Sequence, residues 1–265
     1  MKRIRLFLAI AAVTASLVSC KSQYDVLLMP TTNIDTKYNG ALKYFELGKY
    51  QKAAALFEDL QLPTQGTVRE DTVKYYLGVS NYRYKDYQIA EANFDSFVTI
   101  FGKSPFTEEA KYLRIECLYK STYRYTLDQI PTHKALGAID IFMREYPNNE
   151  HADRILVMKM DLEERLDRKS FESAKLYYTI EDYIAAITAL KNALRDNAEN
   201  LYREDILYYA VMSHYKYADA SVPARQRERF VNMIDEYYNF ISEYPESLRR
   251  PELDGLFKKA QQHMK

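Results

Sequence analysis

One helical pattern recurs five times along this chain and restricts its possible folds more than any other feature. Apolar or small residues occupy relative positions 0, 3, 7 and 10 of each copy. This spacing puts all four residues on one face of an α-helix. The copies begin at Tyr50, Tyr87, Thr132, Tyr183 and Phe230, separated by 37, 45, 51 and 47 residues. The pattern predicts an all-α protein built from repeated helical units.

Each copy is flanked by residues that suit a pair of helices. In three copies a small residue lies nine positions before the first apolar residue, at Ala41, Gly78 and Ala174. A small side chain there lets two antiparallel helices approach closely. An aromatic residue at position 14, followed by glycine or proline, predicts where three of the helices end. These pairs are Phe101-Gly102, Tyr146-Pro147 and Tyr244-Pro245.

Helix pairs with such small and aromatic positions resemble tetratricopeptide (TPR) repeats. The resemblance implies an α-solenoid of about five degenerate TPR-like helix pairs, a fold that usually binds other molecules along its extended surface. The alternative is an irregular helical bundle in which the periodic residues only fill a core. Longer connections are expected at 121–131 and 218–228.

The first twenty residues are typical of a secretory leader. A positively charged start precedes an apolar run at 6–18 that is too short to span a bilayer. Leu17-Val18-Ser19-Cys20 resembles a bacterial lipobox, which implies cleavage after Ser19 and a lipid on Cys20. Ordinary cleavage with an incidental cysteine is the alternative. By resemblance to the usual sorting rule, Lys21 favours the periplasmic face of the outer membrane.

These features divide the chain into four parts. Residues 1–19 are the predicted lipoprotein signal peptide, and 20–35 are the predicted lipidated flexible tether, since they lack helical periodicity. Residues 36–147 and 148–265 are the predicted N-terminal and C-terminal groups of TPR-like units.

No catalytic or metal-binding motif is present in the sequence. The four histidines form no HExxH pair and lie beside no paired cysteine. Phosphate-binding loops and nucleophile elbows are also missing. Cys117 falls on an apolar helix face, which predicts a buried structural thiol. Because 37 basic residues balance 37 acidic ones, no basic footprint for nucleic acid is present. We expect a chain that is not an enzyme and needs no cofactor or metal.

Aromatic residues dominate the candidate binding surface. The chain has 25 tyrosines and 12 phenylalanines. In the TPR pattern, the positions facing the groove in the first helices fall at Tyr38, Phe45, Tyr75, Tyr82 and Arg83. Aromatic rings with a nearby arginine suit a peptide that ends in an aromatic residue and a carboxylate. The alternative for each residue is a place in the core.

The whole pattern resembles the BamD (ComL) family, lipoproteins of the outer-membrane β-barrel assembly machinery. The resemblance rests on the lipobox, the repeats and short runs at 38–41, 48–50, 131–135, 144–149, 174–178 and 194–196. It implies a non-enzymatic, lipid-anchored scaffold that binds the periplasmic domains of BamA and other lipoproteins of the machinery. It also implies that the scaffold receives unfolded outer-membrane β-barrel proteins for folding and insertion.

The resemblance further implies that the N-terminal units face the substrate and the C-terminal half contacts BamA. Arg195, followed by Asp196, falls at a family position tied to communication with BamA. Two features depart from the family: Asn197-Ala198 replaces an aromatic-proline pair, and the fifth unit carries an insertion near 219–229. Two other functions remain as alternatives, a TPR-type lipoprotein that binds peptidoglycan or glycan, and a muramidase-like hydrolase with a buried carboxylate pair.

Overall fold

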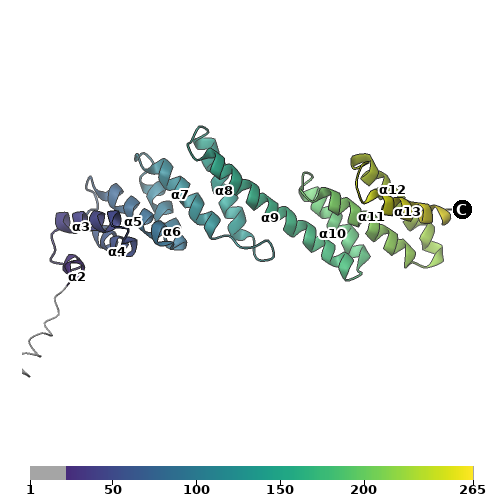
Figure 1. Cartoon of the computed structure of the whole chain (residues 1–265), viewed down its shortest axis with the longest axis horizontal. Coiled ribbons are helices and arrows are strands. Elements are labelled where there is room, and N and C mark those ends of the chain that lie inside the picture. The colour runs from purple at the N-terminus through teal and green to yellow at the C-terminus, as the bar shows by residue number, and fades with distance from the viewer. Residues whose placement is uncertain (1–21, 265) are drawn as a thin grey trace, which may run out of the picture. The chain divides into compact units, whose positions relative to one another are not determined.

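The computed structural model describes residues 22–264, which form twelve helices and no strand (Figure 1). The predicted signal peptide and Cys20 lie outside the described residues. The prediction of an all-α chain is confirmed. The helices are α2 Gln23–Leu27, α3 Ile34–Glu46, α4 Tyr50–Leu60, α5 Glu70–Tyr84, α6 Tyr87–Ile100, α7 Thr107–Lys120, α8 Ile130–Glu145, α9 Ala152–Thr179, α10 Tyr183–Asp196, α11 Arg203–Asp219, α12 Pro223–Glu243 and α13 Arg250–Gln262.

The chain divides into two units. Unit 1 contains the residues up to Ser121 and Gly137–Asn149, and unit 2 contains Thr122–Leu136 and the residues from Glu150 onward. Within each unit successive helices pack against one another, as the repeats predict. Helices two apart also make contact in three cases, α5 with α7, α9 with α11 and α11 with α13. Each unit is therefore built of helix pairs in two layers.

Residues 122–136 belong to unit 2 although the sequence predicts a division near 147. Side chains of α9 hold this segment. The Arg165 guanidinium donates to the Thr122 hydroxyl at 2.8 Å, and Lys169 Nζ donates to the Leu127 carbonyl at 2.6 Å. These contacts join residues that are more than forty positions apart in sequence, so the repeat pattern does not predict them.

The periodic residues form the core. Every residue at positions 3, 7 and 10 of the five copies is buried. The tyrosines at position 0 of three copies are half-buried. The buried set is Ala53, Phe57 and Leu60, Ala90, Phe94 and Phe97, Ala135, Ile139 and Phe142, Ala186, Leu190 and Ala193, and Met233, Tyr237 and Phe240.

Gly78 allows α5 and α6 to pack closely. A Cβ atom added to Gly78 would lie 2.7 Å from Cε1 of Phe94, well inside van der Waals contact. The predicted role of a small residue at this position is therefore confirmed for this pair. Ala41 and Ala174, the equivalent residues of two other pairs, are also buried.

Three helices end at the predicted aromatic residues. Phe101, Tyr146 and Tyr244 each donate a last backbone hydrogen bond of 2.8 Å to the carbonyl four residues earlier. Each ring also packs on the aromatic residue at position 10 of its own helix, with centroids 5.0 to 5.8 Å apart. The aromatic pair thus covers the end of the helix with apolar surface.

The prediction of a flexible tether is wrong for residues 22–35. Helix α2 has a capping box between Ser22 and Asp25, and Leu27 is only 6% exposed. Leu27 packs over Gly40 of α3, where a Cβ atom would lie 2.6 Å from Leu27 Cδ1. A five-residue helix is too short to show a periodic pattern, so its packing depends on the small residue opposite.

The prediction of a long connection at 218–228 is also wrong. Only residues 220–222 separate α11 from α12, because Pro223 is compatible with the first turn of a helix and α12 starts there. The added residues lengthen α12 rather than forming a loop.

We expect Gly78→Ala to lower the free energy of unfolding by about 1 to 3 kcal/mol, because the new methyl group overlaps the Phe94 ring. Gly137→Ala is the matched control, since Gly137 lies inside α8 with open space around its Cα. There the change removes backbone freedom and should stabilise the fold by about 0.5 to 1 kcal/mol. Urea titration measures both effects, and stabilisation by Gly78→Ala would contradict the close approach.

Candidate functional site

The fourth copy of the repeat lacks the aromatic pair that covers three other helix ends. Position 10 is Ala193 and position 14 is Asn197. The backbone still ends normally, because the Asn197 N–H donates to the Ala193 carbonyl at 3.1 Å. Both residues line a pocket of about 660 Å³ within unit 2. The pocket therefore lies at a helix end that no aromatic pair covers; the first copy, with Leu60 and Thr64, lacks the pair as well.

A buried carboxylate on α9 fixes the loop beside this pocket. Asp167, only 8% exposed, accepts a hydrogen bond from Asn197 Nδ2 at 2.7 Å and one from the Leu201 N–H at 3.0 Å. The Asn197 departure from the family pattern therefore has a structural partner. Asp167 was not predicted from the sequence, and the Asn197-Ala198 departure is the signal that pointed to this place.

Tyr202 closes the same loop. Its ring stacks on Phe171 with centroids 5.4 Å apart, and its hydroxyl donates to Glu164. Burial and this hydrogen bond raise the pKa of Tyr202 to about 12, so the hydroxyl stays protonated and keeps donating at neutral pH. The loop is a fixed wall of the pocket.

The rim of the pocket combines acidic and apolar surface. Glu163, Asp196 and Glu199 line it with exposed side chains. Met160 and Leu201 also line it and are 60% and 70% exposed. Solvent-facing apolar side chains among charges are typical of surfaces that bind other polypeptides. The pocket therefore has the composition of a docking site.

Of the two predicted partner-binding residues, Asp196 lines the pocket and Arg195 is its neighbour in sequence. Arg195 and Asp196 form an ion pair with Nη2 and Oδ1 3.2 Å apart, and both side chains are about two-thirds exposed or more, at 70% and 68%. Screening by water makes such a pair worth little to folding. Both side chains therefore contribute little to folding stability and are accessible to a partner.

Two of the predicted substrate-binding residues pack against other rings of unit 1, and a third, Tyr38, is half-buried. Phe45 lies 5.0 Å from the Tyr76 ring, and Tyr75 stacks on Phe106 at 4.4 Å. Burial raises the pKa of Tyr75 to about 12. Tyr38 is half-buried, with the Arg69 guanidinium 4.9 Å from its ring. The structure brings Phe45 and Tyr75 together around Tyr76, where their rings contribute to the core.

The other two predicted substrate-binding residues have different surroundings. The Tyr82 hydroxyl donates to Glu116, a buried carboxylate that also accepts from Tyr112. A peptide carboxylate beside Tyr82 would meet this negative charge. Arg83 is exposed and lines a pocket between the α3–α4 and α5–α6 turns.

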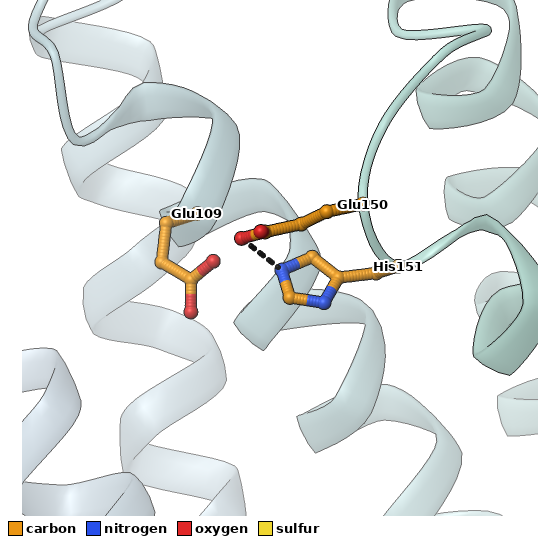
Figure 2. Close-up of side chains that lie close together, drawn as sticks. All are labelled: Glu109, Glu150 and His151. Carbon is orange, nitrogen blue, oxygen red and sulfur yellow. Dashed lines mark ion pairs between the residues drawn. The ribbon is translucent and has the colours of Figure 1, made fainter.

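The cysteine and histidine considered as reactive or metal-binding residues are explained by their surroundings in the fold. Cys117 is fully buried, and burial, followed by the charges of Glu91 and Glu116, raises the pKa of its thiol to about 12. In unit 2, His151 Nε2 lies 3.4 Å from Glu150 Oε1 (Figure 2). Glu109, drawn in the same view, belongs to unit 1, and no cation site is assigned to these residues. Of the described helices, none has the length and apolar character needed to cross a membrane.

Comparison with known proteins agrees with the features above. The family model YfiO, described as an outer membrane lipoprotein, matches residues 31–230. The outer membrane protein assembly factor BamD of Caulobacter vibrioides is 22% identical over 212 residues, covering 78% of this chain and 68% of that protein. A solved structure of the TPR2AB domain of yeast Sti1 in a pHSP90 complex aligns with a TM-score of 0.40 and 12% identity, covering 86% of this chain and 98% of that one. Because the family model covers most of its length, this chain belongs to the YfiO family of outer membrane lipoproteins.

Proposed function

We propose that this protein is a lipid-anchored scaffold of outer-membrane protein assembly. In this proposal unit 2 binds BamA, unit 1 receives unfolded β-barrel proteins, and the lipid on Cys20 holds the chain at the periplasmic face of the outer membrane. Family membership and the name of the Caulobacter relative support the assembly role. The scaffold performs no catalysis in this proposal and works beside the other lipoproteins of the machinery.

The proposed contact with BamA is based on the pocket at the end of α10. Its opening follows from one sequence departure, and Asp167 fixes its wall. Asp196 lines the pocket, and its exposed ion-pair partner Arg195 adds the opposite charge beside it. Paired charges at an interface rim suit a partner with complementary groups and fix its orientation. Apolar Met160 and Leu201 supply area that a partner can bury.

The proposal that unit 1 binds unfolded β-barrel proteins depends on the substrate-binding residues predicted there. Phe45, Tyr75 and Tyr82 are occupied by contacts within the fold, so we propose Tyr38 and Arg83 as the members that act at the surface. Tyr38 offers the edge of a half-buried ring. Arg83 is exposed and has no ion-pair partner among residues 22–264, so its guanidinium can contact an anionic group of a substrate.

The BamA contact predicts the result of a charge reversal. We expect Arg195→Glu with Asp196→Arg to reduce BamA recovery at least tenfold in a pull-down from solubilised outer membranes. This corresponds to a loss of about 1.4 kcal/mol in binding free energy, because both contacts with the partner become repulsive. The melting temperature should stay unchanged, since the pair is exposed.

Arg225→Glu with Glu228→Arg is the matched control, because this second exposed pair lies on α12 away from the pocket. Equal BamA recovery from both variants would contradict the assignment. Retention on peptidoglycan alone, with no BamA, would support the glycan-binding alternative.

The lipid anchor predicts a labelling result. Cells fed a radiolabelled fatty acid should incorporate label into the wild-type chain and not into Cys20→Ser, because only a thiol forms the thioether that the lipobox implies. A Cys117→Ser variant should keep the label, since that thiol is buried. Label on the Cys20→Ser chain would place the lipid elsewhere.

A further inference from the structure

A pocket of about 370 Å³ in unit 1 is lined by four cationic side chains and by no carboxylate. Lys49 and Lys52 come from the α3–α4 turn and the start of α4, and Arg83 and Lys85 come from the end of α5. None of the four pairs with a carboxylate within the part of the chain that the structure describes. We call these four residues the basic pocket.

The backbone brings these cations together. Gly48 and Lys85 both have positive φ, 69° and 71°, at the ends of α3 and α5. Each such turn ends one helix and starts the next within a few residues, and residues of both turns line the same pocket. Lys49 provides no side-chain acceptor for the first N–H groups of α4, which adds positive potential at the same place. The lining of the pocket is therefore positively charged, while Asp25 and Asp59 are carboxylates that act on Tyr24 beside Lys52.

The basic pocket lies next to the N-terminal segment of the described chain. Lys52 Nζ is 4.6 Å from the centroid of the Tyr24 ring in α2. Tyr24 is four residues after Cys20, so extended chain between them reaches at most about 14 Å. If Cys20 carries the proposed lipid, the bilayer surface comes within this distance of α2.

From this placement we infer that the basic pocket binds the phosphates of anionic phospholipid headgroups in the membrane that holds the anchor. The inference rests on the proposed lipid at Cys20. The proposed anchor keeps the membrane surface within reach of these residues, so lipid phosphates are anionic groups that stay close to them. Basic residues near such a surface each strengthen binding about fivefold. The contact would hold unit 1 in one orientation against the membrane, which a lipid on a single cysteine does not achieve.

The test uses the chain produced from Cys20 onward without its leader, so that it carries no lipid and includes every described helix. Circular dichroism checks that the helices form. Sedimentation with vesicles of phosphatidylcholine, alone or mixed with phosphatidylglycerol, then measures binding. Lys49→Gln with Arg83→Gln and Lys85→Asn removes three cations, and asparagine tolerates the positive φ of Lys85. Lys216→Gln with Lys258→Gln and Lys259→Gln is the control, because these exposed lysines of unit 2 give the same net charge.

We expect binding only to the phosphatidylglycerol vesicles, reduced about 100-fold by the first triple variant and little by the second. Equal losses in both variants would overturn the inference, as would the absence of vesicle binding. Displacement by inorganic phosphate beyond the effect of potassium chloride at equal ionic strength would assign a free-phosphate site instead. Displacement by a peptide ending in phenylalanine would assign the pocket to substrate carboxylates. None of these outcomes bears on the fatty-acid label at Cys20, which tests the anchor separately.

Discussion

Close packing of a small residue against a large one underlies the whole arrangement of this chain. At Gly78 the backbone of α5 approaches the Phe94 ring so closely that no Cβ fits between them. Ala41 and Ala174 occupy equivalent places. Three helix pairs have a small buried residue at this position, and in all five copies the apolar stripe of the second helix is buried, so the helix ends lie at the surface. The residues at the helix ends can therefore differ between helix pairs, whereas the buried helix faces stay apolar.

The candidate site follows from such a difference. Three helices cover their ends with two aromatic rings, whereas α10 places Ala193 and Asn197 at those positions. The lost apolar contact is replaced by hydrogen bonds to Asp167, which keep the loop in place and leave the pocket open. The end of α10 lacks ring packing, but its backbone stays in place. A protein partner can therefore bind there without a change of fold.

Much of the fold could be predicted from the repeat, because buried positions at helical spacing depend only on local sequence. The α4 and α6 helices begin at the predicted first residues, and their residues at positions 3, 7 and 10 of the repeat are buried. Helix α2 was missed since its stability comes from Leu27 against Gly40, a tertiary contact. Asp167 was missed for the same reason, as it bonds a loop thirty residues later. Of the predicted aromatic surface, Phe45 and Tyr75 are packed, because periodicity gives the side of a helix but not which rings meet on it.

The most direct measurement of the central claim is cross-linking in cells from the wall of the pocket. A photoreactive residue is placed at Asn197, and at the exposed Ser242 of α12 as the comparison. The account predicts that BamA is trapped from position 197 and not from position 242. Trapping of BamA from neither position, or from both equally, would contradict the claim that the uncovered end of α10 holds a polypeptide partner.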